Sequence, residues 1–115
     1  MKKTKTLLQM VHAANPDRHD RTLARRLIKL SEELGEVSEA YLSVTSENNA
    51  KGKTWGDVRE ELIDLMIVTM DCLLTRLPGE DKVGFKTRQA EIEWIVAIKL
   101  EKWRQAMEAG SAPTL

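Results

Sequence analysis

Glutamates are crowded into one short stretch of the chain, and metal binding is the sharpest chemistry they could do. The stretch KLSEELGEVSEA, residues 29–40, carries four of them: Glu32, Glu33, Glu36 and Glu39. Side chains three residues apart on a helix share a face, so the carboxylates of Glu33 and Glu36 would project together. Paired carboxylates are ligands for hard cations. Taken alone, the stretch is also typical of a solvated helix face.

A second group of acids lies in the most apolar segment of the chain, LIDLMIVTMDCLL, residues 62–74. Ten of its thirteen residues are apolar, and the exceptions are Asp64, Thr69 and Asp71. A helix that is apolar nearly all round is buried inside a bundle or an oligomer. The acids of this helix fall within one sector about 100° wide. The sector holds no lysine or arginine, and its acids are Asp57, Glu60, Glu61, Asp64 and Asp71.

Acids held together beside apolar residues repel one another, and a bound cation would relieve the repulsion. Like charges at this spacing destabilise even an exposed helix by roughly 0.2–0.5 kcal/mol per pair. The ligands would all be oxygen atoms, which favours Mg²⁺ first and Mn²⁺ second. Zinc is not expected, because the chain has no cluster of cysteine and histidine. If the two acidic helices pack antiparallel, Glu33 and Glu36 would face Glu61 and Asp64.

Hydrophobic periodicity predicts four helices to position these acids, at about residues 4–14, 22–45, 55–77 and 87–109. No segment alternates strongly enough to predict a strand, so the expected fold class is all-α. Asp20 is the expected N-cap of the second helix, while Thr54 and Asp57 resemble a capping box at the start of the third. The second helix carries an apolar stripe whose spacing indicates one buried face. Its members are Leu23, Leu27, Leu30, Leu34, Val37, Tyr41 and Val44.

Composition narrows the class of protein. The 115 residues suit a single domain, residues 1–115, and 18 basic residues balance 18 acidic ones, so bulk charge does not predict nucleic-acid binding. No signal peptide or membrane-spanning segment is expected, and one cysteine, Cys72, fits a reducing compartment, which together predict a cytoplasmic protein. The apolar third helix needs more cover than four helices easily provide, so we expect a homodimer or a homotetramer.

The two acidic motifs together resemble a known family. EELGE, residues 32–36, followed by EELID, residues 60–64, resembles the EExxE…ExxD signature of the MazG-like, all-α nucleoside triphosphate pyrophosphohydrolases. The resemblance implies a four- to five-helix, bundle-like fold of the MazG type. It also implies hydrolysis of a nucleoside triphosphate to the monophosphate and pyrophosphate, by a metal-activated water attacking the α-phosphorus. The implied role is housecleaning of the nucleotide pool.

The resemblance also implies roles for individual residues. The metal ligands would be Glu33, Glu36, Glu61 and Asp64, with Mg²⁺ as the cofactor. Glu32 matches the first glutamate of the EExxE motif and would be a further ligand or would orient the attacking water. The physics agrees with this chemistry, because four carboxylates and a triphosphate can approach one another only through bridging cations.

Residues that could bind the rest of the substrate are less clearly marked. The candidates are His12, Asn15, Trp55, Lys99, Lys102 and Trp103. His12 and Asn15 precede the second helix, where family members often place base or ribose contacts, although both also fit an ordinary loop. Trp55 could stack on a base, and it could equally serve as a hydrophobic staple or an interface residue. Lys99, Lys102 and Trp103 belong to a basic-aromatic cluster on the last helix, whose basic residues could neutralise phosphates or could form an ordinary polar face.

Two other classes of protein could also carry acidic helices of this kind. A di-iron carboxylate bundle requires Glu-x-x-His pairs, but His12 and His19 both fall outside the glutamate-bearing helices. A non-catalytic helical module could instead use the acidic cluster to bind a structural cation or a basic partner. Intact acids at all five motif positions favour the enzyme.

Overall fold

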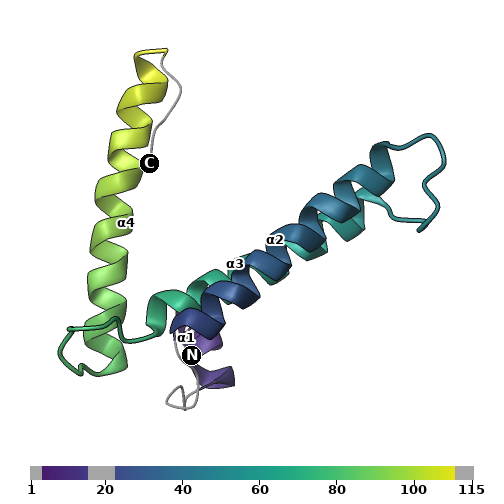
Figure 1. The fold of residues 1–115 in the computed structure, drawn as a ribbon. Helices are drawn as coiled ribbons and strands as arrows, with labels where there is room; N and C mark the ends of the chain where they lie inside the picture. The colour runs from purple at the N-terminus through teal and green to yellow at the C-terminus, as the bar shows by residue number, and fades with distance from the viewer. Residues whose placement is uncertain (1–3, 16–22, 111–115) are drawn as a thin grey trace. The chain divides into compact units, whose positions relative to one another are not determined.

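The computed structural model describes residues 4–15 and 23–110, where α-helices are joined by loops (Figure 1). Four helices follow one another along the chain: α1 (Leu7–Ala14), α2 (Leu23–Thr45), α3 (Trp55–Leu74) and α4 (Phe85–Glu108). Within the described ranges there is no strand, so the prediction of an all-α protein is confirmed. Asp20, the expected N-cap, and His19 lie outside the described residues.

Local sequence explains where two of the helices begin. The predicted capping box of α3 is confirmed: the Thr54 hydroxyl accepts the N–H of Asp57 at 3.2 Å, and the Asp57 carboxylate accepts the N–H of Thr54 at 2.8 Å. Thr6 and Gln9 form a second capping box at the start of α1. Each box satisfies two backbone donors that the first turn of a helix leaves without partners.

The third helix ends at Leu74, three residues before the predicted end, because local side chains compete for its last turn. The Thr75 backbone is extended, and its hydroxyl donates to the carbonyl of Asp71 at 2.9 Å. Glu80 then accepts the N–H of Leu77 at 2.7 Å. Side-chain bonds of this kind offer the backbone an alternative to the helical ladder.

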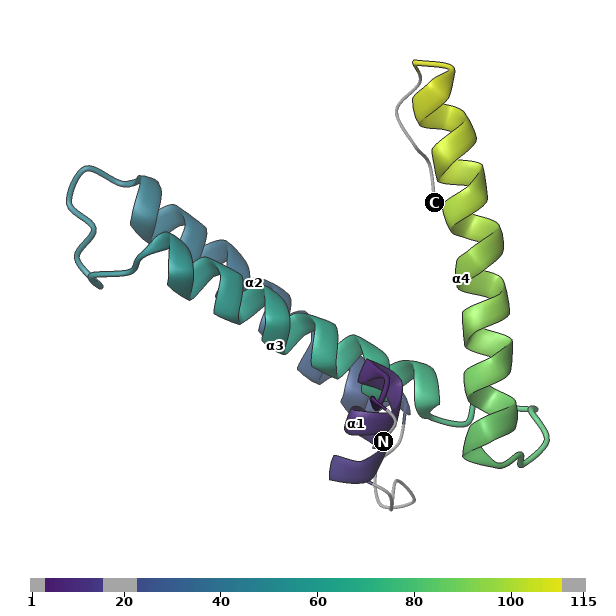
Figure 2. The same cartoon turned by 180° about the vertical axis from the view of Figure 1, so that it is seen from behind.

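The chain forms two compact units, Met1–Glu80 and Asp81–Leu115. The first unit contains α1, α2 and α3, and the second contains α4. In the first unit α2 and α3 run antiparallel and side by side along most of their length, as both views show (Figures 1 and 2). The short helix α1 packs against α3. The acidic motifs of α2 and α3 therefore lie on neighbouring helices.

The face of α2 that packs on α3 differs from the predicted stripe. Leu27, Leu34 and Tyr41 are 48%, 55% and 52% exposed, so their predicted burial is wrong for the single chain. A single facing helix covers only one narrow row of side chains, spaced alternately three and four residues apart. Arg26 and Glu33 belong to that row. Its buried and half-buried members are Leu23, Arg26, Leu30, Glu33, Val37, Ala40 and Val44.

The apolar helix α3 is only partly covered by α1 and α2. None of its residues is buried, although ten consecutive positions in its second half are largely apolar. Leu62, Ile63, Ile67 and Leu73 each expose more than two fifths of their surface. Among the described residues, no helix is long and apolar enough to cross a membrane.

Candidate metal centre

Three carboxylates from two facing helices converge near the middle of the α2–α3 pair. Glu33 comes from α2, while Glu61 and Asp64 come from α3, where their spacing of three residues puts them on one face. One carboxylate oxygen of each residue lies within 4.8 Å of the others. The structure thus brings together three of the four residues that the sequence predicts as metal ligands.

The innermost oxygens of this cluster have no hydrogen-bond donor. Glu33 is only 6% exposed, and its Oε2 atom is buried without a partner among the described residues. The Oε2 atom of Glu61 is also buried without a hydrogen-bond partner among the described residues. Buried carboxylate oxygens normally accept hydrogen bonds or bind a cation, because losing water without compensation costs free energy. Two such atoms beside a third carboxylate therefore fit a cation that binds oxygen.

Glu36, the fourth predicted ligand, lies close enough to this cluster to interact with it. Its hydrogen-bonding contact with Glu33, followed by the negative charge of that carboxylate, raises the pKa of Glu36 above the usual value for glutamate. Glu61 acts in the same direction. A shared proton is the usual way for crowded carboxylates to reduce their repulsion when no cation is bound.

Lys29 supplies the cluster with one positive charge. Its ammonium group lies one helical turn before Glu33 and donates to Glu33 Oε1 at 3.0 Å. This hydrogen bond raises the pKa of Lys29 and lowers that of Glu33. Lys29 is about half exposed, so its side chain has room to move away from Glu33.

Glu32, the predicted catalytic residue, lies outside the three-carboxylate cluster. Its side chain is 60% exposed, and its Oε2 atom is 3.8 Å from the ammonium group of Lys29. Neighbouring residues on a helix point about 100° apart, so Glu32 cannot share the inward direction of Glu33. The structure leaves Glu32 at the solvent edge of the cluster, and its role in catalysis stays a prediction.

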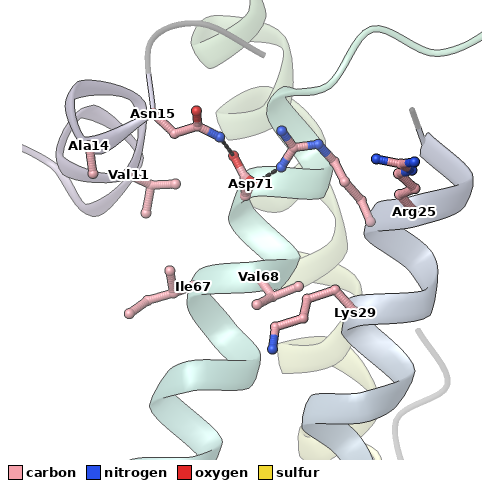
Figure 3. A pocket seen from close by; sticks show the side chains of 9 residues that line it. Val11, Ala14, Asn15, Arg25, Lys29, Ile67, Val68 and Asp71 are labelled. Carbon is pink, nitrogen blue, oxygen red and sulfur yellow. Dashed lines mark hydrogen bonds and ion pairs between the residues drawn. The ribbon is translucent and has the colours of Figure 1, made fainter. Parts of the chain in front are cut away.

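A hollow of about 500 Å³ has Lys29, the ion-pair partner of Glu33, in its lining (Figure 3). Asn15 donates to Asp71 at 3.4 Å, and Arg26 forms an ion pair with the same carboxylate. These two contacts tie α1 and α2 to α3 at one point. The residues that line the hollow are Val11, Ala14, Asn15, Arg25, Arg26, Lys29, Ile67, Val68 and Asp71.

The predicted substrate-binding residues do not all lie beside this hollow. Asn15 lines the hollow, whereas His12 is a half-buried residue of α1 that is not part of its lining. Trp55 is 60% exposed and packs against Tyr41, with ring centroids 6.0 Å apart. It lines neither this hollow nor the smaller one beside the loop between α2 and α3. Lys99, Lys102 and Trp103 lie on α4 in the second unit, and their role stays a prediction.

Arg26 and Lys29 were not among the predicted site residues, although the sequence held a signal for them. Positions 26, 29 and 33 are separated by three and four residues, so they follow one face of a helix that leads to Glu33. Tracing that face back from the motif would have found both residues.

A second hollow, of about 300 Å³, adjoins the cluster. Two of its walls are the acids Glu36 and Glu61, and two are the lysines of the loop between α2 and α3. The residues that line it are Glu36, Glu39, Ala40, Lys51, Lys53 and Glu61. Glu61 of the acidic cluster therefore lines the second hollow, and Lys29 connects the cluster to the first, so each hollow has lysine in its wall.

Comparison with known proteins adds no relative to this description. No protein-family model matches the chain, and no curated protein or solved structure matches it either.

Proposed function

We propose that this protein is a Mg²⁺-dependent nucleoside triphosphate pyrophosphohydrolase with a MazG-type fold. It would hydrolyse a ribo- or deoxyribonucleoside triphosphate to the monophosphate and pyrophosphate. The observation that carries the proposal is the convergence of Glu33, Glu61 and Asp64 from two helices. Two of these residues contribute buried oxygens that lack a donor.

The donor set fits Mg²⁺. All the candidate ligand atoms are carboxylate oxygens, which Mg²⁺ and Mn²⁺ prefer and which suit zinc or copper poorly. When bound there, Mg²⁺ would lower the pKa of a coordinated water and polarise the phosphate oxygens. Glu36, which lies beside Glu33 and Glu61, would become the fourth ligand. Glu32, at the solvent edge, would orient the attacking water or serve as a further ligand.

The hollow beside Lys29 supports a nucleotide as the substrate. Val11, Ile67 and Val68 give it apolar walls on which a base could pack, and Asn15 offers an amide for the base edge. Lys29 stands between this hollow and Glu33. It would release Glu33 when the metal binds and would turn its charge toward the phosphates of the substrate.

A homodimer or homotetramer completes the proposal. Large apolar side chains on both long helices of the first unit are half exposed in the single chain, and water contact with them costs free energy. A second copy would cover part of this surface. The side chains concerned include Leu27, Ile28, Leu34, Leu42, Leu62, Ile63, Ile67 and Leu73.

A panel of normal and damaged nucleoside triphosphates tests the function. Each compound is incubated with the protein and Mg²⁺, and the products are separated by anion exchange. We expect at least one compound to yield the monophosphate and pyrophosphate, and Asp64→Asn to abolish that turnover while keeping the helical circular dichroism signal. Release of orthophosphate would contradict the mechanism. Binding of Mn²⁺ without turnover of any compound would favour the non-catalytic module instead.

A further inference from the structure

The hollow between the acidic cluster and the α2–α3 loop is lined by groups of opposite charge. Glu36 and Glu61 form one side of it, and Lys51 and Lys53 contribute to another. Lys51 forms an ion pair with Glu39, but both side chains are more than half exposed. Exposed pairs of this kind contribute little to stability and exchange partners easily. The ammonium group of Lys51 is therefore available to an anion that enters the hollow.

The loop that carries the two lysines is held in one conformation by Asn49. The Asn49 side chain accepts from the hydroxyl of Ser43 at 2.6 Å and from the N–H of Lys53 at 3.0 Å. It also donates to the carbonyl of Lys53 at 2.8 Å. Asn49 has a positive φ of 32°, which asparagine tolerates better than most residues. This network fixes the backbone of Lys53 against the end of α2.

The two hollows and the cluster follow one another along α2. Lys29 marks the first hollow, Glu33 the cluster, and Glu36 and Glu39 the second hollow. A helix rises about 1.5 Å per residue, so Lys29 and Glu39 are about 15 Å apart along its axis. A nucleoside triphosphate laid in this direction would have its base in the first hollow and its α-phosphate at the cluster. Its last two phosphates would then reach the second hollow.

We propose that Lys51 and Lys53 bind the two terminal phosphates of the substrate, and therefore the leaving pyrophosphate. This inference rests on the proposed function. In that reaction the water oxygen bonds to the α-phosphorus, and the bond from that phosphorus to the bridging oxygen breaks. The bridging oxygen leaves with the electron pair as part of pyrophosphate, and one proton passes to solvent. Negative charge grows on the leaving group, where two ammonium groups would stabilise it.

Binding of magnesium pyrophosphate tests the inference directly. Isothermal titration calorimetry compares the wild type with Lys51→Ala/Lys53→Ala, in the full chain with Mg²⁺ present. We expect the double substitution to weaken binding by about tenfold or more, because two charge-assisted contacts are lost. Lys82→Ala/Lys86→Ala removes the same charge from two exposed lysines outside the hollow and should bind as the wild type does.

Three further measurements separate a binding role from a structural one. Lys51→Arg/Lys53→Arg should restore most of the affinity, since arginine also binds phosphate. Mn²⁺ binding, followed by electron paramagnetic resonance, should persist in the alanine variant. The kcat of the alanine variant should fall as well, because the contacts between the lysines and the leaving pyrophosphate would strengthen in the transition state. Unchanged affinity in the alanine variant, or no pyrophosphate binding by the wild type, would overturn the inference.

The outcomes distinguish this inference from the proposed function. If Lys51→Ala/Lys53→Ala hydrolyses nucleotides with wild-type kinetics, the proposed enzymatic function holds and the two lysines are not part of its substrate site. If the wild type hydrolyses no nucleotide but binds pyrophosphate, and the double variant loses that binding, the proposed enzymatic function is wrong. The two lysines would then form an anion-binding site without catalysis.

Discussion

The ion pair between Arg26 and Asp71 is buried, and its burial sets how much stability we expect the protein to lose when the pair is broken. The side chain of Arg26 is 4% exposed and that of Asp71 is 15% exposed. Replacing Asp71 with leucine removes the carboxylate that α3 offers to a buried guanidinium. Breaking a buried pair from one side costs about 3–5 kcal/mol, because the remaining charge stays out of water. The same change removes the hydrogen bond from Asn15.

A loss of this size is large for a small protein. Total stabilities are about 5–15 kcal/mol. For a chain of this length, a loss of 3 kcal/mol lowers the melting temperature by about 12 °C. Thermal and urea unfolding, followed by circular dichroism, measure both quantities. Arg26→Met/Asp71→Leu should recover much of the loss, since a well-packed apolar pair often equals or exceeds a buried ion pair in stability.

The exposed pair between Glu101 and Arg104 supplies the matched control. Both of its side chains are more than half exposed. Glu101→Leu should therefore change the stability far less than Asp71→Leu does. A loss below about 1 kcal/mol for Asp71→Leu, the range of exposed pairs, would refute the buried tie between α2 and α3.

Three more predictions concern the metal site and the start of α3. Mg²⁺ at a hundred times its dissociation constant should stabilise the wild type and Glu60→Gln by about 2.7 kcal/mol, but not Glu61→Gln, in thermal unfolding. Thr54→Ala should lower the free energy of unfolding in urea by about 1 kcal/mol, and an unchanged value would argue against the capping box. The Thr54 N–H, then its hydroxyl, lower the pKa of Asp57, so this stabilisation is present above the ordinary value of 3.8 and is lost as pH falls through the lowered pKa. Asp57→Asn should remove that part of the pH dependence of unfolding.

Features set by neighbours in the sequence could be predicted well. The capping box of Thr54 and Asp57 depends on three consecutive peptide units, and the structure contains it. The facing of Glu33 and Glu61 required only that two adjacent helices pack antiparallel, which a short polar loop favours. Both conclusions use spacing on a single helix and the shortest connection between two helices.

Features set by distant contacts could not be predicted. The spacing of the apolar residues of α2 predicts one buried stripe, but the row of side chains that meets α3 depends on how the two helices are rotated. In the structure the row that contains Arg26 and Glu33 faces α3, and Leu27 and Leu34 stay half exposed. The partner of Arg26 is 45 positions away in the sequence, so it depends on the register between the helices. Lys51 reaches the site through the shape of a loop.

The most direct test of the metal-centred enzyme compares two neighbouring glutamates of α3. Glu61 belongs to the carboxylate cluster, whereas Glu60 is exposed and outside it. The measurement is the Mg²⁺-dependent rate of pyrophosphate release from the best substrate of the panel. We predict that Glu60→Gln keeps a rate close to that of the wild type and that Glu61→Gln loses about 100-fold or more, because a ligand of the proposed metal is gone. Equal rates in the two variants would contradict the account.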